Sequence, residues 1–201
     1  PDMPGEVTMK HHTGERVVLT RLEPAEARET LGVYLAMDGN FGQQTEALRD
    51  KAAAFALCLR QGCLSTVEAW IALRTTIWKT LEYPMEAGTL TRAQWEVVLK
   101  PLYRPVLNAS DFVKNFSHDI LFGPPQDLGL HLKHPYVNQF IRQLQVALDE
   151  TSSSSVTHDL LIATAEQLRL ELGFPGTFSE VPFHKVTPYI TVSWWSELLT
   201  Y

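Results

Sequence analysis

The side chains best placed to share a metal ion are Asp127, His131 and His134, because carboxylate and imidazole ligands three or four residues apart can face one ion from a helix. Gly129 lies inside this segment and Pro135 ends it, which argues against one continuous helix. We therefore interpret both histidines as exposed or turn residues and expect no metal site in this chain.

Other reactive arrangements are missing from the sequence. It contains no glycine-rich phosphate-binding loop and no G-x-S-x-G nucleophile motif. Cys58 and Cys63 lie in an apolar helical stretch with no histidine nearby, so we interpret them as small core residues. With no further cysteines, a disulfide scaffold is excluded and a reducing, intracellular compartment is favoured. We expect that the chain alone is not an enzyme.

Positive charge is concentrated in the middle third of the chain. Residues 43–108 carry 8 basic and 6 acidic side chains, a net charge of +2. Residues 1–42 and 109–201 have net charges of −3 and −5, and the whole chain has −6. Only the middle segment could therefore present a basic surface to a polyanion.

The cations of this segment could contact nucleic-acid phosphates. Our candidates are Arg74, Lys79, Arg92 and Lys100, and Arg104 lies on or beside the predicted helix that carries the last two. A few such contacts hold and position a polyanion without reading its base sequence. The alternative is that these side chains form an ordinary solvated helix surface.

The first 42 residues show the alternation and turn residues of short β-strands. Strands are predicted around Val7–Met9 and at Arg16–Thr20, with a turn at His11–Gly14 between them, and a third strand is predicted at Thr30–Leu35. We predict a mainly α fold, a helical bundle with a small antiparallel β element at its N-terminal edge.

From Gln43 the apolar spacing becomes helical. One helix is predicted up to Gly62, and Ser65–Glu68 and Thr91–Gln94 are capping boxes that begin two more. Pro101 is expected to kink or end the third helix, and Pro105 should prevent its continuation.

The last third is predicted to be helical around a polar break. A further amphipathic helix carries the apolar residues Tyr136, Val137, Phe140, Ile141, Leu144 and Leu148. The serines of Thr151–Ser155 form a flexible linker or a loop tip. The next helix is expected to bury Leu160, Leu161, Leu168 and Leu172, and a last helix begins at Thr187–Pro188. We divide the chain into residues 1–42, 43–150 and 151–201.

Three short motifs follow one another along the chain: Glu29–Val33 with a Leu-Gly pair, Thr75–Pro84 ending in Leu-x-Tyr-Pro, and Leu121–Leu130 with Gly-Pro followed by Leu-Gly-Leu. In this order they resemble the end of the palm, the thumb helix and the following turn of reverse transcriptases from non-LTR (LINE-like) retrotransposons. The similarity covers about Val17 to Gly173. Gln126–Asp127 stands in place of the first glycine of that family's Gly-Leu-Gly-Leu turn.

The resemblance implies a non-catalytic role. The family's polymerising carboxylates, a Tyr-x-Asp-Asp pair and a third aspartate, precede the region that this sequence resembles. The chain would therefore be a thumb-like region that grips an RNA or RNA–DNA duplex, with the upstream polymerase region of the same protein as its partner. Mg²⁺ is expected only in that upstream region, and we expect the chain to be part of a longer protein. A membrane partner is not expected, because no run of about 18 apolar residues occurs.

The acidic balance of the chain favours an alternative function, a helical protein-interaction or regulatory domain that does not bind nucleic acid. A continuous positive groove on the folded surface would favour nucleic-acid binding. Scattered cations beside an exposed apolar patch would favour protein interaction.

Overall fold

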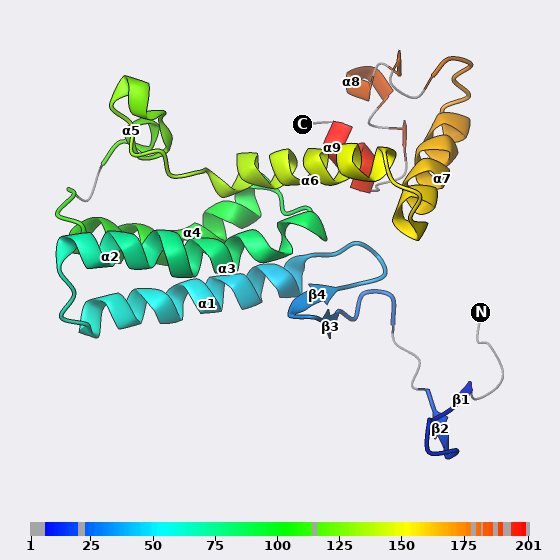
Figure 1. The fold of residues 1–201 in the computed structure, drawn as a ribbon, viewed down its shortest axis with the longest axis horizontal. Helices are drawn as coiled ribbons and strands as arrows, with labels where there is room; N and C mark the ends of the chain where they lie inside the picture. Colours follow the sequence, from blue (N-terminus) through cyan, green and yellow to red (C-terminus); the bar gives the residue numbers. More distant parts are fainter. Residues whose placement is uncertain are drawn as a thin grey trace.

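The computed structural model is mainly α-helical, as predicted, with two short β-hairpins before the helices (Figure 1). It describes residues 7–19, 23–113, 116–177, 180–181, 183–186, 189–190 and 194–199. No helix in these ranges is both long enough and apolar enough to cross a lipid bilayer. The elements are β1 (Thr8–Lys10), β2 (Arg16–Val18), β3 (Arg28–Thr30), β4 (Val33–Leu35), α1 (Gly42–Gln61), α2 (Thr66–Ala72), η1 (Leu73–Ile77), α3 (Trp78–Glu82), η2 (Tyr83–Glu86), α4 (Arg92–Ala109), α5 (His118–Phe122), η3 (Pro125–Asp127), α6 (Pro135–Thr151), α7 (Val156–Glu171), α8 (Phe183–Val186) and α9 (Trp194–Leu199).

The N-terminal β element is two separate hairpins. Strands β1 and β2 pair antiparallel around the predicted His11–Gly14 turn. The predicted third strand, Thr30–Leu35, is confirmed only for Val33–Leu35, which form β4. β4 pairs with β3, and Leu31 and Gly32 form the two-residue turn between them. Their φ angles are 51° and 82°, which suits the turn that matches the twist of a hairpin. The Leu-Gly pair of the first resembling motif therefore lies in a turn.

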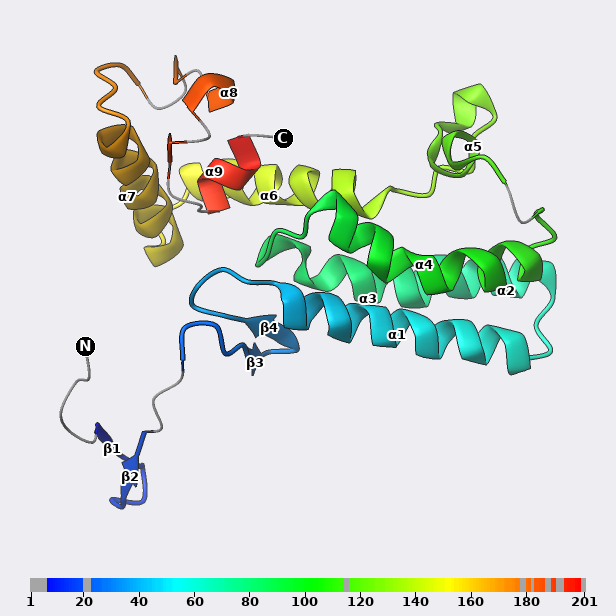
Figure 2. The same cartoon turned by 180° about the vertical axis from the view of Figure 1, so that it is seen from behind.

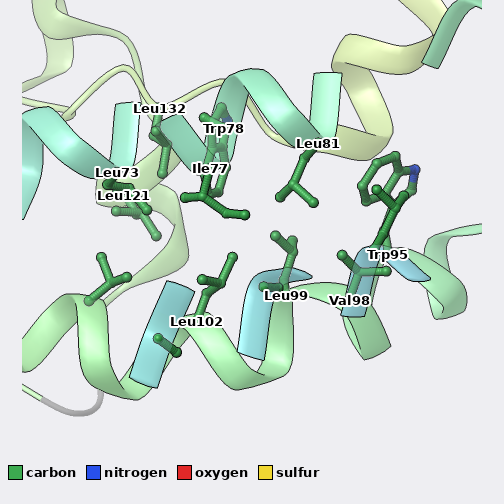
Figure 3. Packing of buried hydrophobic residues seen from close by; sticks show 14 of the residues in the cluster. Leu73, Ile77, Trp78, Leu81, Trp95, Val98, Leu99, Leu102, Leu121 and Leu132 are labelled. Carbon is green, nitrogen blue, oxygen red and sulfur yellow. The ribbon is translucent and has the colours of Figure 1, made fainter. Parts of the chain in front are cut away.

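The core lies between α1, α4 and the helical stretch α2–η1–α3, and Figure 3 shows its side chains meeting from both sides. Trp95, Leu99 and Leu81 are fully buried there, and burying each such side chain contributes about 1.5–3 kcal/mol. The Trp78 indole N–H donates to the Lys133 carbonyl at 2.9 Å, which ties the segment before α6 to this core. Both predicted capping boxes are present, one at the start of α2 and one at the start of α4.

Helix α4 continues through both of its prolines. The expectation that Pro105 prevents continuation is wrong, since α4 ends only at Ala109. A proline in a helix interior costs about 3 kcal/mol, because it removes one backbone hydrogen bond. Leu102 and Val106 in the same two turns are buried in the core, and their burial offsets much of that cost.

Helix α6 packs on the bundle through polar side chains. Gln139 is completely buried: its Oε1 accepts from the Leu90 backbone N–H at 2.9 Å and from the Trp95 indole N–H at 3.1 Å. Its Nε2 donates to the Leu90 carbonyl at 3.1 Å. One turn later the buried Gln143 donates to the Thr89 hydroxyl at 2.9 Å. These bonds fix which face of α6 meets the bundle.

A buried carboxylate reinforces this contact. Glu82, at the end of α3, accepts from Arg142 of α6 at 2.9 Å and from the Asn138 amide at 3.3 Å. Arg142 also pairs with Glu86 at 3.1 Å, and Lys79 pairs with Glu82 at 2.7 Å. Removing Arg142 would leave the Glu82 carboxylate with only an exposed lysine as its charge partner.

Helix α6 is amphipathic, as predicted, but most of its apolar face points to solvent and polar side chains occupy its buried face. Of the predicted apolar set, Phe140 is buried and Tyr136 is half-buried. The other four, Val137, Ile141, Leu144 and Leu148, are exposed.

Helices α7 and α9 pack against the C-terminal end of α6 (Figure 2). The Thr151–Ser155 break is a tight turn, in which the Ser153 hydroxyl donates to Glu150 and Ser155 caps α7. Leu168 is buried as predicted, whereas Leu160 is exposed, which corrects that prediction. Gly173 ends α7 with φ of 61°. The predicted start of the last helix at residues 187–188 lies outside the described residues.

The segment between α5 and α6 folds back on itself through two glycines. The His131 N–H donates to the Gly123 carbonyl at 3.0 Å, and the Leu130 N–H donates to the Ile120 carbonyl at 2.8 Å. A Cβ atom at residue 129 would lie 2.1 Å from the Gly123 carbonyl oxygen, so only glycine fits there. Leu128 before it has a φ of 60°.

We predict that Gln139→Ala is strongly destabilising. The substitution leaves the Leu90 N–H, the Leu90 carbonyl and the Trp95 indole N–H buried without a partner, at about 1–3 kcal/mol each. Urea unfolding should show a loss of at least about 3 kcal/mol in the free energy of unfolding. Gln145→Ala, an exposed change on the same helix, is the control and should stay within about 0.5 kcal/mol of the native chain.

We predict that Leu31→Asn is stabilising. Leu31 is 86% exposed and has positive φ, a backbone conformation that asparagine tolerates better than leucine. The free energy of unfolding should rise by about 0.5–1 kcal/mol. Met37→Asn, also at an exposed position but without positive φ, should give no gain. If Leu31 instead lay on a strand, Leu31→Asn would destabilise the protein.

Candidate nucleic-acid interface

The structure pairs two of the four candidate cations with acidic side chains. Lys79 contacts Glu82 at 2.7 Å, and Arg92 contacts Glu96 at 3.6 Å across one helical turn. The Arg92–Glu96 pair is exposed on both sides and contributes only about 0–1 kcal/mol, so a phosphate could still compete for Arg92. Lys79, in contrast, is held by the buried Glu82 carboxylate.

The other two candidates, Arg74 and Lys100, are exposed and make no ion pair within the described part of the chain. Arg74 lies in η1, a π-helical turn between α2 and α3. Lys100 lies on α4, one turn before Arg104. Residues four apart on a helix share a face, so Lys100 and Arg104 point to the same side of α4.

An open hollow of about 500 Å³ brings Arg104 together with Arg60, a residue outside the predicted set. It lies between the ends of α1 and α4, and its remaining lining residues are Leu59, Pro105, Asn108 and Ala109. Neither arginine makes an ion pair among the described residues. Two exposed guanidinium groups and an amide therefore border one concave surface. We name this hollow, bordered by Arg60, Arg104 and Asn108, together with Lys100 one turn before Arg104, the basic hollow.

Parallel packing of α1 and α4 produces this arrangement. The two helices run in the same direction (Figure 1), so their C-terminal ends lie together. Arg60 is in the last turn of α1, where a cation balances the negative end of the helix dipole. Two arginines can bind oxyanions through paired N–H donors, a geometry that matches phosphate. The hollow is therefore suited to holding a phosphate group on an open surface.

Only part of this site could be predicted from the sequence. The four-residue spacing of Lys100 and Arg104 indicates a shared face, whereas Arg60 is 44 positions away from Arg104 and joins it only through packing. The apparent metal ligands do not form a site: across the described residues no group of three or more His, Cys, Asp or Glu side chains could hold an ion. Cys58 and Cys63 are exposed, which corrects their interpretation as core residues.

One histidine, just before α6, has an unusual environment. His134 is half-buried, its ring lies 4.6 Å from that of Phe122, and its Nδ1 has no hydrogen-bond partner. Burial lowers its pKa first, and the charges of Arg92 and His118 lower it further, against a smaller opposite effect of Glu96. The folded protein therefore favours the neutral imidazole.

This lowered pKa predicts a loss of stability in mild acid. The unfolded chain binds a proton at His134 near pH 6.5, before the folded chain does, so stability is full above that pH and declines as the pH falls toward the folded pKa. The melting temperature should be lower at pH 5.5 than at pH 7.5. Replacing His134 with Gln should reduce this difference, whereas His12→Gln in the exposed hairpin turn should leave it unchanged.

Comparison with known proteins identifies no relative of this chain. No family model matches the chain, and no curated protein or solved structure is significantly similar to it. The resemblance to reverse transcriptase thumbs therefore stays a prediction that rests on the three sequence motifs and their order.

Proposed function

We propose that this chain is a non-catalytic, thumb-like region of a reverse transcriptase-like protein and grips a nucleic-acid duplex through backbone phosphates. The observation that carries the proposal is the basic hollow, where Arg60 and Arg104 border one concave surface and Lys100 lies one turn away. The order of the three motifs supports the same function.

The surface charge around the hollow suits a polyanion. Glu96 is the acidic side chain within α4, and Arg92 contacts it at 3.6 Å. Asp111, just past the end of α4, accepts a hydrogen bond from the Thr66 hydroxyl at 3.0 Å. Lys100, Arg104 and Asn108 follow Glu96 at four-residue spacing on one face, over about 12 Å of helix. This length spans two or three phosphates of one strand, since successive phosphates are several ångströms apart. Contacts of this kind hold a duplex without selecting its sequence.

We predict that the chain binds an RNA–DNA hybrid with a steep dependence on salt. Fluorescence anisotropy at about 50 and 200 mM salt measures both the affinity and its salt slope. Arg104→Gln and Lys100→Gln should each weaken binding several-fold and reduce the slope by about one unit. Arg60→Gln should have the same effect, because its side chain borders the same hollow.

Two further substitutions serve as controls in this titration. Arg169→Gln on α7 removes an arginine that pairs with Glu166, so it matches the loss of charge but lies outside the basic hollow. It should leave the affinity within about twofold. Arg92→Gln should have a smaller effect than Arg104→Gln. Absent or salt-independent binding would reject nucleic-acid gripping, and equal losses in Arg169→Gln and Arg104→Gln would reject the hollow as its site.

The exposed apolar face of α6 favours the second candidate function, a helical protein-interaction domain that does not bind nucleic acid. The same titration separates the two candidates. A chain that folds and leaves the hybrid unbound at low salt would belong to this second class.

A further inference from the structure

A continuous apolar stripe runs along the outer face of α6. Its members are Val137, Ile141, Leu144 and Leu148, with exposed fractions of 42%, 48%, 50% and 61%. Their spacing of four, three and four residues is that of the seam along which two helices pack in a coiled coil. We name these four residues the α6 stripe.

Hydrogen bonds on the opposite face of α6 hold the stripe outward. Gln139 and Gln143 on the opposite face are completely buried and are bonded to Leu90 and Thr89. Rotating α6 to bury the stripe would break these bonds and expose their buried partners. The stripe stays exposed beside the described elements that pack against α6, which are η2, α3, α4, α7 and α9.

An apolar hollow lies beside the first half of the stripe. It has a volume of about 360 Å³, and Val137 and Ile141 form part of its wall together with Phe122 and Leu132. Lys133 and His134 also line it. The hollow is large enough for one leucine side chain and offers it mainly carbon surface.

The charges at the two ends of α6 are opposite. Lys133 lies just before the helix and is exposed. Asp149 is exposed beyond the other end of the stripe, and neither Lys133 nor Asp149 forms an ion pair within the described ranges. A helix running in the opposite direction with the same charge order would match both ends.

We infer that the α6 stripe docks against the α6 stripe of a second copy of this chain, with the two helices antiparallel. The stripe is symmetric under this reversal: Val137 meets Leu148 of the second copy, and Ile141 meets Leu144. Leu148 of each copy then enters the hollow beside Val137 of the other. Lys133 of each copy faces Asp149 of the other, within reach of its four-carbon side chain.

Such an interface is self-complementary and closes as a twofold dimer. A stripe of four side chains is small compared with the roughly 800 Å² per partner of a standard interface, so we expect a dissociation constant of about 10 µM. Nucleic acid takes no part in this contact. The dimer can therefore be tested independently of the proposed function.

Sedimentation equilibrium of the whole chain without nucleic acid tests the inference. Between about 1 and 200 µM the native chain should pass from monomer to dimer. Leu144→Glu should weaken the dimer at least about tenfold, because it places two buried carboxylates at the centre of the interface. Leu170→Glu is the matched control, since Leu170 is 69% exposed on α7, outside the stripe, and it should leave dimerisation unchanged. Circular dichroism should show native helix content in both variants.

A charge exchange tests the orientation. Lys133→Glu and Asp149→Lys should each weaken the dimer several-fold, and the double variant should restore it, since both symmetric pairs are then re-formed with reversed sign. A native chain that stays monomeric up to about 200 µM would overturn the inference. So would equal weakening by Leu144→Glu and Leu170→Glu. A double variant no stronger than either single variant would overturn the antiparallel pairing.

Discussion

The buried amide of Gln139 is the contact on which the arrangement of this molecule depends. It joins three groups that would otherwise be unsatisfied in the interior, two on the Leu90 backbone and one on the Trp95 indole. Because an unpaired buried polar group costs more than a hydrogen bond gains, these bonds specify one rotation of α6 rather than merely adding stability. Leu90 itself lies just before the capping box that begins α4, so the same amide links α6 to the start of the central helix.

Predictions from the sequence are confirmed where local signals determine the structure and are wrong where distant partners determine it. The capping boxes, the early helices and the first hairpin follow from local signals, since side-chain caps and turn residues act within a few positions. The inward face of α6 depends instead on partners about 50 positions away, and the apolar pattern alone indicates the wrong face. The continuation of α4 past Pro105 has the same origin, because long-range packing outweighs a local cost of about 3 kcal/mol.

The same difference between local and distant contacts applies to the candidate site. The two residues of each ion pair, Arg92–Glu96 on α4 and Lys79–Glu82 on α3, are neighbours on the same helix. Their pairing could therefore be deduced from spacing. It reduces the positive charge of two predicted cations. Arg60 and Arg104 come together only because α1 and α4 pack in parallel, which no pattern in the sequence encodes. The basic hollow thus includes an arginine that spacing could not identify.

The basic hollow and the α6 stripe differ in what holds them in place. The basic hollow is formed by α1 and α4, which share an apolar core, and it needs no contribution from α6. The α6 stripe faces outward only while the polar contacts to Leu90, Thr89 and Glu82 are intact. Polar bonds depend on geometry more strongly than apolar packing does, so a local disturbance at Gln139 would reorient the stripe before it altered the hollow. The proposed phosphate binding and the proposed self-association therefore depend on separate parts of this chain.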